Sequence, residues 1–123
     1  MQNTKKRILV VDDDDMNLAR TQIILEEEYD VVLAESGVRA LNLLKNQKID
    51  LVLLDIDMPL MNGIETFEHM KEFAADIPVI FLTASGEVED VVGALLLGAA
   101  DYLKKPYKPQ ELLKRVAQEF EKK

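Results

Sequence analysis

The sequence predicts an α/β fold: a doubly wound parallel sheet of five strands with five helices on its two faces. Two features of the 123 residues support this prediction. Five short apolar runs alternate with longer segments of helical periodicity, an order typical of parallel strands joined by right-handed crossovers. Four of the runs are also apolar on consecutive positions, as strands buried on both faces are. The length suits a single domain spanning residues 1–123.

The predicted strands are the apolar runs themselves, at residues 8–11, 31–34, 51–54, 79–82 and 101–103. After each run, apolar residues recur at helical spacing. They are, segment by segment, Leu18 and Leu25; Val38, Leu41 and Leu44; Ile64, Phe67 and Met70; Val88, Val91, Val92, Leu95, Leu96 and Leu97; and Leu113, Val116 and Phe120. The fourth segment is apolar on more than one face, and Pro109 suits the first position of the last helix.

Composition excludes several classes of protein. The net charge of −8 argues against direct nucleic-acid binding, which needs a basic surface to neutralise phosphates. The absence of cysteine excludes disulfides, thiolate metal sites and a cysteine nucleophile. The apolar stretch 91–100 is far shorter than the roughly 20 residues of a membrane span, and the run after the basic first residues is too short for a secretory signal. We therefore expect a cytoplasmic protein that contacts neither nucleic acid nor membrane.

Polar residues gather directly after the predicted strands. Ligands of open parallel sheets bind there, outside the carboxyl ends of the strands. The residues concerned are Asp12, Asp13, Asp14, Asp15, Asp55, Asp57, Thr83, Ala84, Ser85, Lys104 and Lys105. If the first and third strands are neighbours, three carboxylates converge, and their mutual repulsion favours a bound cation. A pocket of oxygen ligands suits Mg²⁺, with Mn²⁺ as a substitute, better than zinc.

These residue types together are the parts that phosphoryl transfer to an aspartate requires. Asp55 would be the nucleophile, and the divalent ion would neutralise the incoming phosphoryl group. Thr83 would supply a hydroxyl donor, and Lys104 or Lys105 a positive charge. Ala84 is small and would leave room beside the acceptor.

Each part alone has a simpler explanation. The aspartate run could be a solvated turn in which Asp14 or Asp15 caps the next helix. Threonine is common in strands, and a Lys-Pro pair usually marks only a loop. His69 falls beside glutamates on the polar face of the third helix, where we expect a solvated surface residue. The prediction of a site therefore depends on all four clusters following strand ends.

Four segments carry a resemblance to a known family. They read ILVVDD from Ile8, LLDIDMP from Leu53 with Gly63 soon after, PVIFLTA from Pro78, and GAADYLKKP from Gly98. Over nearly its whole length the sequence resembles the receiver domains of bacterial two-component response regulators, including the chemotaxis regulators. The resemblance implies a flavodoxin-like fold with strand order 2-1-3-4-5 and a role in phosphorelay signalling.

The resemblance also implies a role for each site residue. Asp55 would accept the phosphoryl group. Asp13 would bind Mg²⁺ directly, Asp12 would act close by and partly through water, and the main-chain carbonyl of Asp57 would be a further ligand. Lys105 would contact the phosphoryl group.

In the family the bond between this lysine and the following proline is cis, so we expect a cis Lys105–Pro106 bond with Lys104 pointing away. The phosphoryl group on Asp55 would draw in the hydroxyl of Thr83, with Ala84 alongside. The vacated space would let the ring of Tyr102 turn inward. The surface formed by the fourth helix, fifth strand and fifth helix would then change its affinity for partners.

The implied partners are a sensor histidine kinase or a phosphotransfer protein, and a downstream effector protein or domain. The implied activity is that of a phosphoacceptor switch and not of an enzyme, with self-catalysed phosphotransfer and autodephosphorylation only. Some receivers dimerise through the switch surface by charge pairs, which Asp101, Glu111 and Arg115 could form here. Val91 and Val92 stand where a basic residue would be, so a homodimer is left open.

Two other functions fit part of the pattern. Asp55-x-Asp57 at a strand end resembles the haloacid dehalogenase phosphatases, in which the second aspartate is an acid-base catalyst. Met58 and Pro59 follow here, however, and the chain ends before the later acidic pair. An unphosphorylated interaction module of the same fold would lack the acceptor, the lysine or the acidic pair, and none is lacking. In a receiver, Asp57 and Ser85 would instead tune the lifetime of the phosphoryl group.

Overall fold

The computed structural model describes residues 5–84, 93 and 98–122. Within these ranges the chain forms five strands and four helices, which alternate along the sequence as predicted. They are β1 (Arg7–Val11), α1 (Asp15–Leu25), β2 (Asp30–Ala34), α2 (Gly37–Asn46), β3 (Leu51–Asp55), α3 (Gly63–Met70), β4 (Val79–Thr83), β5 (Asp101–Lys104) and α5 (Pro109–Glu121). The fourth helix expected over 88–97 lies, apart from Gly93, outside the described residues.

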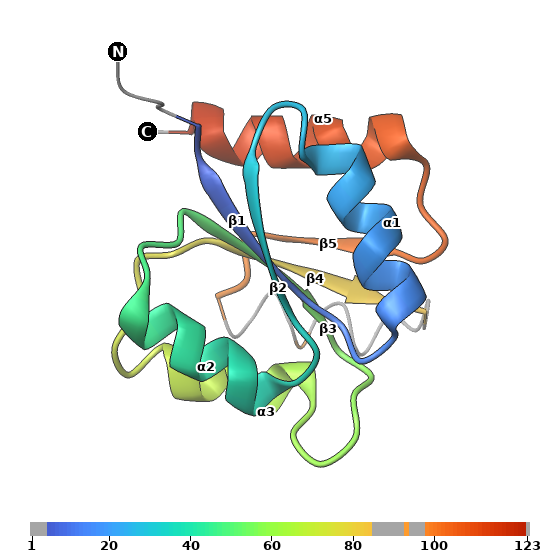
Figure 1. Cartoon of the computed structure of the whole chain (residues 1–123). Helices are drawn as coiled ribbons and strands as arrows, with labels where there is room; N and C mark the ends of the chain where they lie inside the picture. Colours follow the sequence, from blue (N-terminus) through green and yellow to red (C-terminus); the bar gives the residue numbers. More distant parts are fainter. Residues whose placement is uncertain (1–4, 85–92, 94–97, 123) are drawn as a thin grey trace.

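The strands form one parallel sheet in the order β2-β1-β3-β4-β5, which confirms the expected topology (Figure 1). Three register pairs define its carboxyl edge: Val11 opposite Leu54, Asp55 opposite Leu82, and Thr83 opposite Lys104. The strands therefore end at nearly the same level. The residues that follow them share one edge of the sheet.

Helices cover both faces of the sheet, with α1 and α5 on one side and α2 and α3 on the other (Figure 1). Alternate residues of each strand point to opposite faces. In β1, Ile8 and Val10 pack in the α1/α5 core, whereas Leu9 and Val11 pack in the α2/α3 core. Complete burial of one such side chain contributes about 1.5–3 kcal/mol to folding. This two-sided burial explains why the strands are apolar on consecutive positions.

The apolar face of α2 differs from the predicted one. Val38 was expected to share a buried face with Leu41 and Leu44, but its side chain is 57% exposed. Ala40, Leu43 and Leu44 are the buried apolar residues of this helix. At 100° per residue, a step of three residues falls about 60° short of a full turn. The two such steps that separate Val38 from Leu44 therefore place Val38 outside the buried face. The i, i+3, i+4 spacing of the buried residues follows the helical period.

Side-chain caps start three of the helices. The Asp14 carboxylate accepts a hydrogen bond from the N–H of Met16 and begins α1, which confirms the capping role considered for it. Ser36 caps α2 in the same way. Asn62 and Glu65 form a reciprocal capping box at the start of α3. These caps hold the helix N-termini next to the loops that leave the carboxyl edge of the sheet.

Candidate functional site

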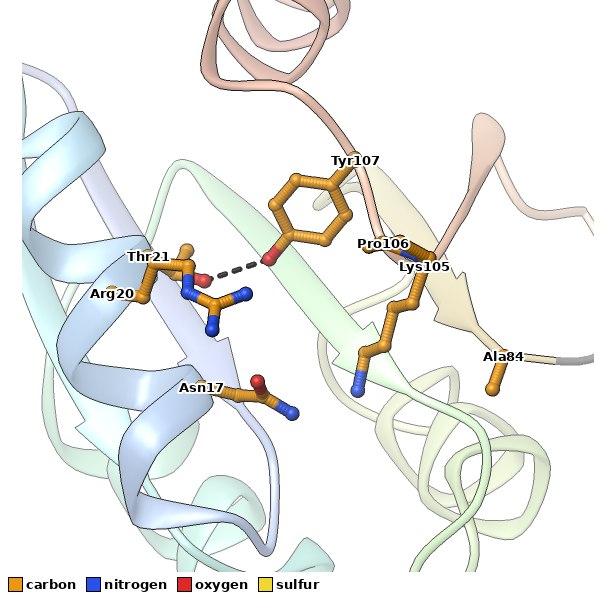
Figure 2. A pocket seen from close by; sticks show the side chains of 7 residues that line it. All are labelled: Asn17, Arg20, Thr21, Ala84, Lys105, Pro106 and Tyr107. Atoms are coloured by element: carbon orange, nitrogen blue, oxygen red, sulfur yellow. Dashed lines mark hydrogen bonds between the residues drawn. The ribbon is translucent and has the colours of Figure 1, made fainter.

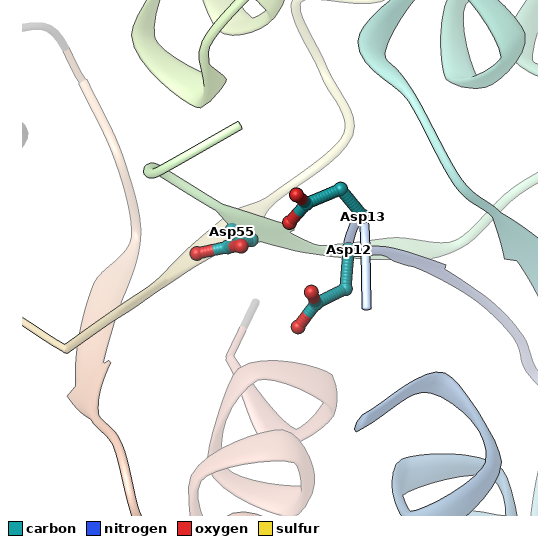
Figure 3. A group of neighbouring side chains, drawn as sticks. All are labelled: Asp12, Asp13 and Asp55. Atoms are coloured by element: carbon teal, nitrogen blue, oxygen red, sulfur yellow. The ribbon is translucent and has the colours of Figure 1, made fainter. Parts of the chain in front are cut away.

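Three carboxylates converge at the carboxyl edge of the sheet. Asp12 and Asp13 directly follow β1, and Asp55 is the last residue of the neighbouring β3. One carboxylate oxygen from each lies within 4.8 Å of those of the other two. Figure 3 shows the three side chains from close by. Asp12 and Asp55 are buried, whereas Asp13 is exposed. The arrangement is an oxygen-lined corner that can hold a divalent cation and remains open to solvent on one side.

Lys105 brings a positive charge to this corner from the loop after β5. Its ammonium lies 2.7 Å from Asp12 Oδ2 and 3.4 Å from Asp55 Oδ1. The Lys105–Pro106 bond is cis, as expected, and the neighbouring Lys104 is exposed. Lys105, and not the exposed Lys104, therefore lies at the corner, as the resemblance implied.

Burial dominates the electrostatics of Asp55. It raises the pKa of the carboxyl group from an ordinary value of 3.8 to about 6, because the charged form is removed from water. The charge of Lys105 opposes this shift, and the charge of Asp12 adds to it. Burial also acts to lower the pKa of Lys105, but its hydrogen bond to Asp12 and the charge of Asp55 outweigh burial and leave that pKa raised. The corner therefore holds more negative charge than one ammonium balances.

The backbone after β3 turns back toward Asp55. The N–H of Asp57 donates to Asp55 Oδ1 at 3.2 Å, and the N–H of Gly63 donates to the carbonyl of Ile56 at 3.0 Å. A Cβ at Gly63 would collide with the carbonyl oxygen of Asp55 and would lie 2.8 Å from Ile56 Cα. A glycine at this position therefore lets the loop close tightly against the backbone of Asp55 and Ile56. The Asp57 side chain is exposed beside it.

The remaining predicted residues lie on β4 and β5. Thr83 is the last residue of β4 and is 1% exposed, and Ala84 follows it at the surface. Tyr102 on β5 is half-buried against the α2/α3 core. Ser85 lies outside the described residues. His69 is exposed on α3, as expected for a surface residue.

The charged residues considered for a dimer contact pair within the chain. Arg115 Nη1 donates to Asp101 Oδ1 at 2.8 Å and to the carbonyl of Tyr102 at 3.1 Å, and Glu111 lies 3.7 Å from the same guanidinium. These contacts tie α5 to β5. The apolar residues expected on the fourth helix lie outside the described residues.

A cavity beside Lys105 involves residues that sequence reasoning did not single out. Asn17, Arg20 and Thr21 line it from α1, and Tyr107 lines it from the loop after Pro106 (Figure 2). The three α1 residues are spaced i, i+3 and i+4 and follow the aspartate run directly. That spacing on one helical face was the available signal.

The fold and the acidic corner together define a class of α/β protein with a carboxylate site at the carboxyl edge of a parallel sheet. The sequence profile of the response regulator receiver domain matches residues 8–117. The response regulator SaeR of Staphylococcus aureus is 44% identical over 110 residues, which are 89% of this chain and 48% of SaeR. The chain therefore spans about half the length of this curated relative.

Solved receiver structures superpose closely. A CheY-like receiver domain protein from Methanospirillum hungatei JF-1 has a TM-score of 0.89 at 35% identity and covers 94% of both chains. The BeF₃-activated receiver domain of DrrB has a TM-score of 0.89 at 32% identity, covering 97% of this chain and 100% of that one. The chain belongs to the response regulator receiver domain family, whose members are phosphoacceptor switches of two-component signalling.

Receiver domains bind Mg²⁺ through acidic residues, and the cluster of Asp12, Asp13 and Asp55 has the matching chemistry. None of the helices in the described part of the chain combines the length and apolar character that crossing a membrane requires.

Proposed function

We propose that this chain is a phosphorelay switch that accepts a phosphoryl group on Asp55 in a Mg²⁺-dependent reaction. The observation that carries the proposal is the convergence of Asp12, Asp13 and Asp55 at one strand edge, with Lys105 bridging two of them. Such a corner has an excess of negative charge at neutral pH that an added cation can balance. With that cation bound, the corner can receive a dianionic phosphoryl group. The unit that performs this reaction is a receiver domain spanning residues 1–123.

Each residue has a defined part in the proposed reaction. Asp12, Asp13, Asp55 and the main-chain carbonyl of Asp57 hold the metal, which supplies charge neutralisation when bound. The Asp55 carboxylate would form a bond to phosphorus as the bond from phosphorus to the phosphohistidine nitrogen of the donor breaks and its electron pair stays on that nitrogen, and Lys105 would contact the new phosphoryl oxygens.

The switch would follow from Thr83 and Tyr102. Thr83 ends β4 next to the acceptor strand and supplies a hydroxyl donor to a phosphoryl oxygen, while the exposed Ala84 leaves room for that group. The Tyr102 side chain is half-buried, and in the phosphorylated state its ring would turn further inward. Its movement would alter the surface of the fourth helix, β5 and α5.

Family membership also supports the partners in this proposal. The phosphodonor is a sensor histidine kinase or a phosphotransfer protein, and the target is an effector protein or domain, in the cytoplasm. A homodimer through the switch surface would require Arg115 to exchange its internal partner Asp101 for that residue of a second copy.

Intact-mass spectrometry with a small phosphodonor tests the proposal. The protein should gain the mass of one phosphoryl group with Mg²⁺, and the gain should disappear with a chelator or in Asp55→Asn. Asp57→Asn is the matched control, because it removes an exposed carboxylate two residues away; it should still be phosphorylated, with a changed rate of autodephosphorylation. A wild-type protein that gains no mass from a competent donor would instead be an inert interaction module.

The switch has a test of its own. BeF₃ activates the receiver domain of DrrB, so it is a suitable reagent for this chain. NMR spectra with BeF₃ and Mg²⁺ should show shifts at Thr83 and Tyr102 that are absent in Asp55→Asn. Shifts restricted to Asp55 and its loop would contradict the role given to Tyr102.

A further inference from the structure

A preformed cavity of about 250 Å³ adjoins the phosphoacceptor corner. It lies between α1 and the loop after β5, and Lys105 belongs to both the cavity and the corner. A molecule that binds Asp55 through its phosphoryl group can therefore place its remaining atoms in this space. This volume is large enough to hold a small organic group.

A part-buried hydrogen bond connects the two walls of the cavity. The hydroxyls of Thr21 on α1 and Tyr107 on the loop lie 2.7 Å apart, although the residues are 86 positions apart in sequence (Figure 2). Thr21 is 1% exposed, and the Tyr107 ring packs on the α1/α5 core. The cavity is therefore part of the folded structure before any ligand arrives.

The α1 wall of the cavity carries the positive charge of Arg20. Figure 2 shows the guanidinium of Arg20 and the ammonium of Lys105 extending from opposite walls toward the cavity, with the amide of Asn17 at one end. Lys105 is paired with Asp12 and Asp55. The Arg20 side chain has no hydrogen bond or ion pair within the described ranges 5–84, 93 and 98–122. In a chain of net charge −8, a guanidinium without a carboxylate partner at a cavity wall can bind an external anion.

We propose that this cavity receives the leaving group of acyl phosphate donors, and that Arg20 is the residue that recognises it. The inference rests on Asp55 being the acceptor. An Asp55 oxygen forms a bond to phosphorus as the bond from phosphorus to the acyl oxygen breaks, and the electron pair of that bond remains on the departing carboxylate. Arg20 pairs with this developing carboxylate in the planar two-bond geometry that guanidinium groups favour, and the Asn17 amide donates beside it.

The chemistry predicts discrimination between donors. An acyl phosphate releases an anion, which gains from a nearby guanidinium as charge develops. Phosphoramidate releases neutral ammonia, which gains nothing from Arg20. The same Asp55, metal and Lys105 serve both donors, so only the leaving-group subsite separates them.

Donor-specific rates of phosphorylation test the proposal. Arg20→Gln should slow phosphorylation of Asp55 by acetyl phosphate with Mg²⁺ about tenfold, the effect of losing one charge-assisted hydrogen bond, and should change the phosphoramidate rate less than about twofold. Arg39→Gln is the matched control, because Arg39 is exposed on α2 and carries the same charge. It should leave both rates within about twofold of the wild type.

The outcomes are distinct. Equal slowing with both donors in Arg20→Gln would show an effect on the phosphoryl group or the fold and would overturn the inference. Unchanged rates with both donors, or a loss matched by Arg39→Gln, would overturn it as well. If the wild-type protein takes no phosphoryl group from either donor with Mg²⁺, the proposed function fails first. Phosphorylation by phosphoramidate alone would leave the proposed function intact and remove the acyl phosphate subsite.

Discussion

The substitution Asp55→Asn should raise the free energy of unfolding when no metal is bound. The size of this increase should depend on pH. Asp55 is 3% exposed and lies next to Asp12 and Asp13, so its ionised form is costly in the native state. Asp55→Asn keeps the shape of the carboxyl group and removes its charge. Lys105 keeps its closer partner Asp12 in the variant, at 2.7 Å, so the ammonium stays paired.

The raised pKa of Asp55 gives the size and sign of this effect. A native pKa of about 6 against 3.8 in the unfolded chain means that the native state holds the proton more tightly. The associated stability is fully present below pH 3.8 and is lost as the pH rises through about 6, by about 3 kcal/mol in all. Between about pH 5 and pH 7.5, the wild type should lose about 1–2 kcal/mol that Asp55→Asn does not lose.

Urea unfolding of both proteins at these two pH values, with a chelator present, measures the difference. The free energy of unfolding of Asp55→Asn minus that of the wild type should grow by about 1–2 kcal/mol at the higher pH. Asp57→Asn, an exposed carboxylate two residues later, controls for the loss of one charge and should show little such growth. Saturating Mg²⁺ at the higher pH should shrink the difference, because the cation stabilises only the charged corner. A difference that is independent of pH, or a less stable Asp55→Asn at pH 7.5 without metal, would refute the reasoning.

Three further substitutions test the structural argument. Gly63→Ala should lower the free energy of unfolding in urea by about 1–3 kcal/mol and slow phosphorylation, because its Cβ would collide with the backbone of Asp55 and Ile56. Tyr107→Phe should cost about 1–2 kcal/mol by leaving the buried Thr21 hydroxyl without its partner, and the double variant with Thr21→Val should cost less than the sum of the single changes. Phe81→Ala should cost about 3–5 kcal/mol in thermal or urea unfolding, because Phe81 is fully buried; a loss below 1 kcal/mol would contradict its place in the core.

Sequence reasoning succeeded where a local sequence pattern is compatible with only one structure. The consecutive apolar residues of β1 and β3 indicated burial on both faces, and the two cores confirm it. The strand boundaries shifted by about one residue, so that Asp55 and Thr83 end their strands and do not follow them. The face of α2 was wrong because three-residue steps do not follow the helical period of 3.6, which left Val38 exposed.

Local sequence could not choose among residues whose roles depend on distant partners. Lys104 and Lys105 are alike in sequence, and only the packing of the loop after β5 brings Lys105 to Asp12, 93 positions away. Arg20 gave no signal by itself, because an exposed arginine on a helix is ordinary. The anion-binding role proposed for Arg20 depends on its position across the cavity from Lys105.

The sequence by itself determined the alternation of strands and helices, the two-sided burial of the sheet and the set of polar residues after the strands. Those features follow from side-chain periodicity and from hydrophobic burial, which act between near neighbours in the chain. Only the tertiary structure decided which carboxylates meet, how strongly burial raises the pKa of Asp55, and which cation pairs with it. Distance and solvent exclusion set these properties, and both arise when strands far apart in sequence are brought to one edge of the sheet.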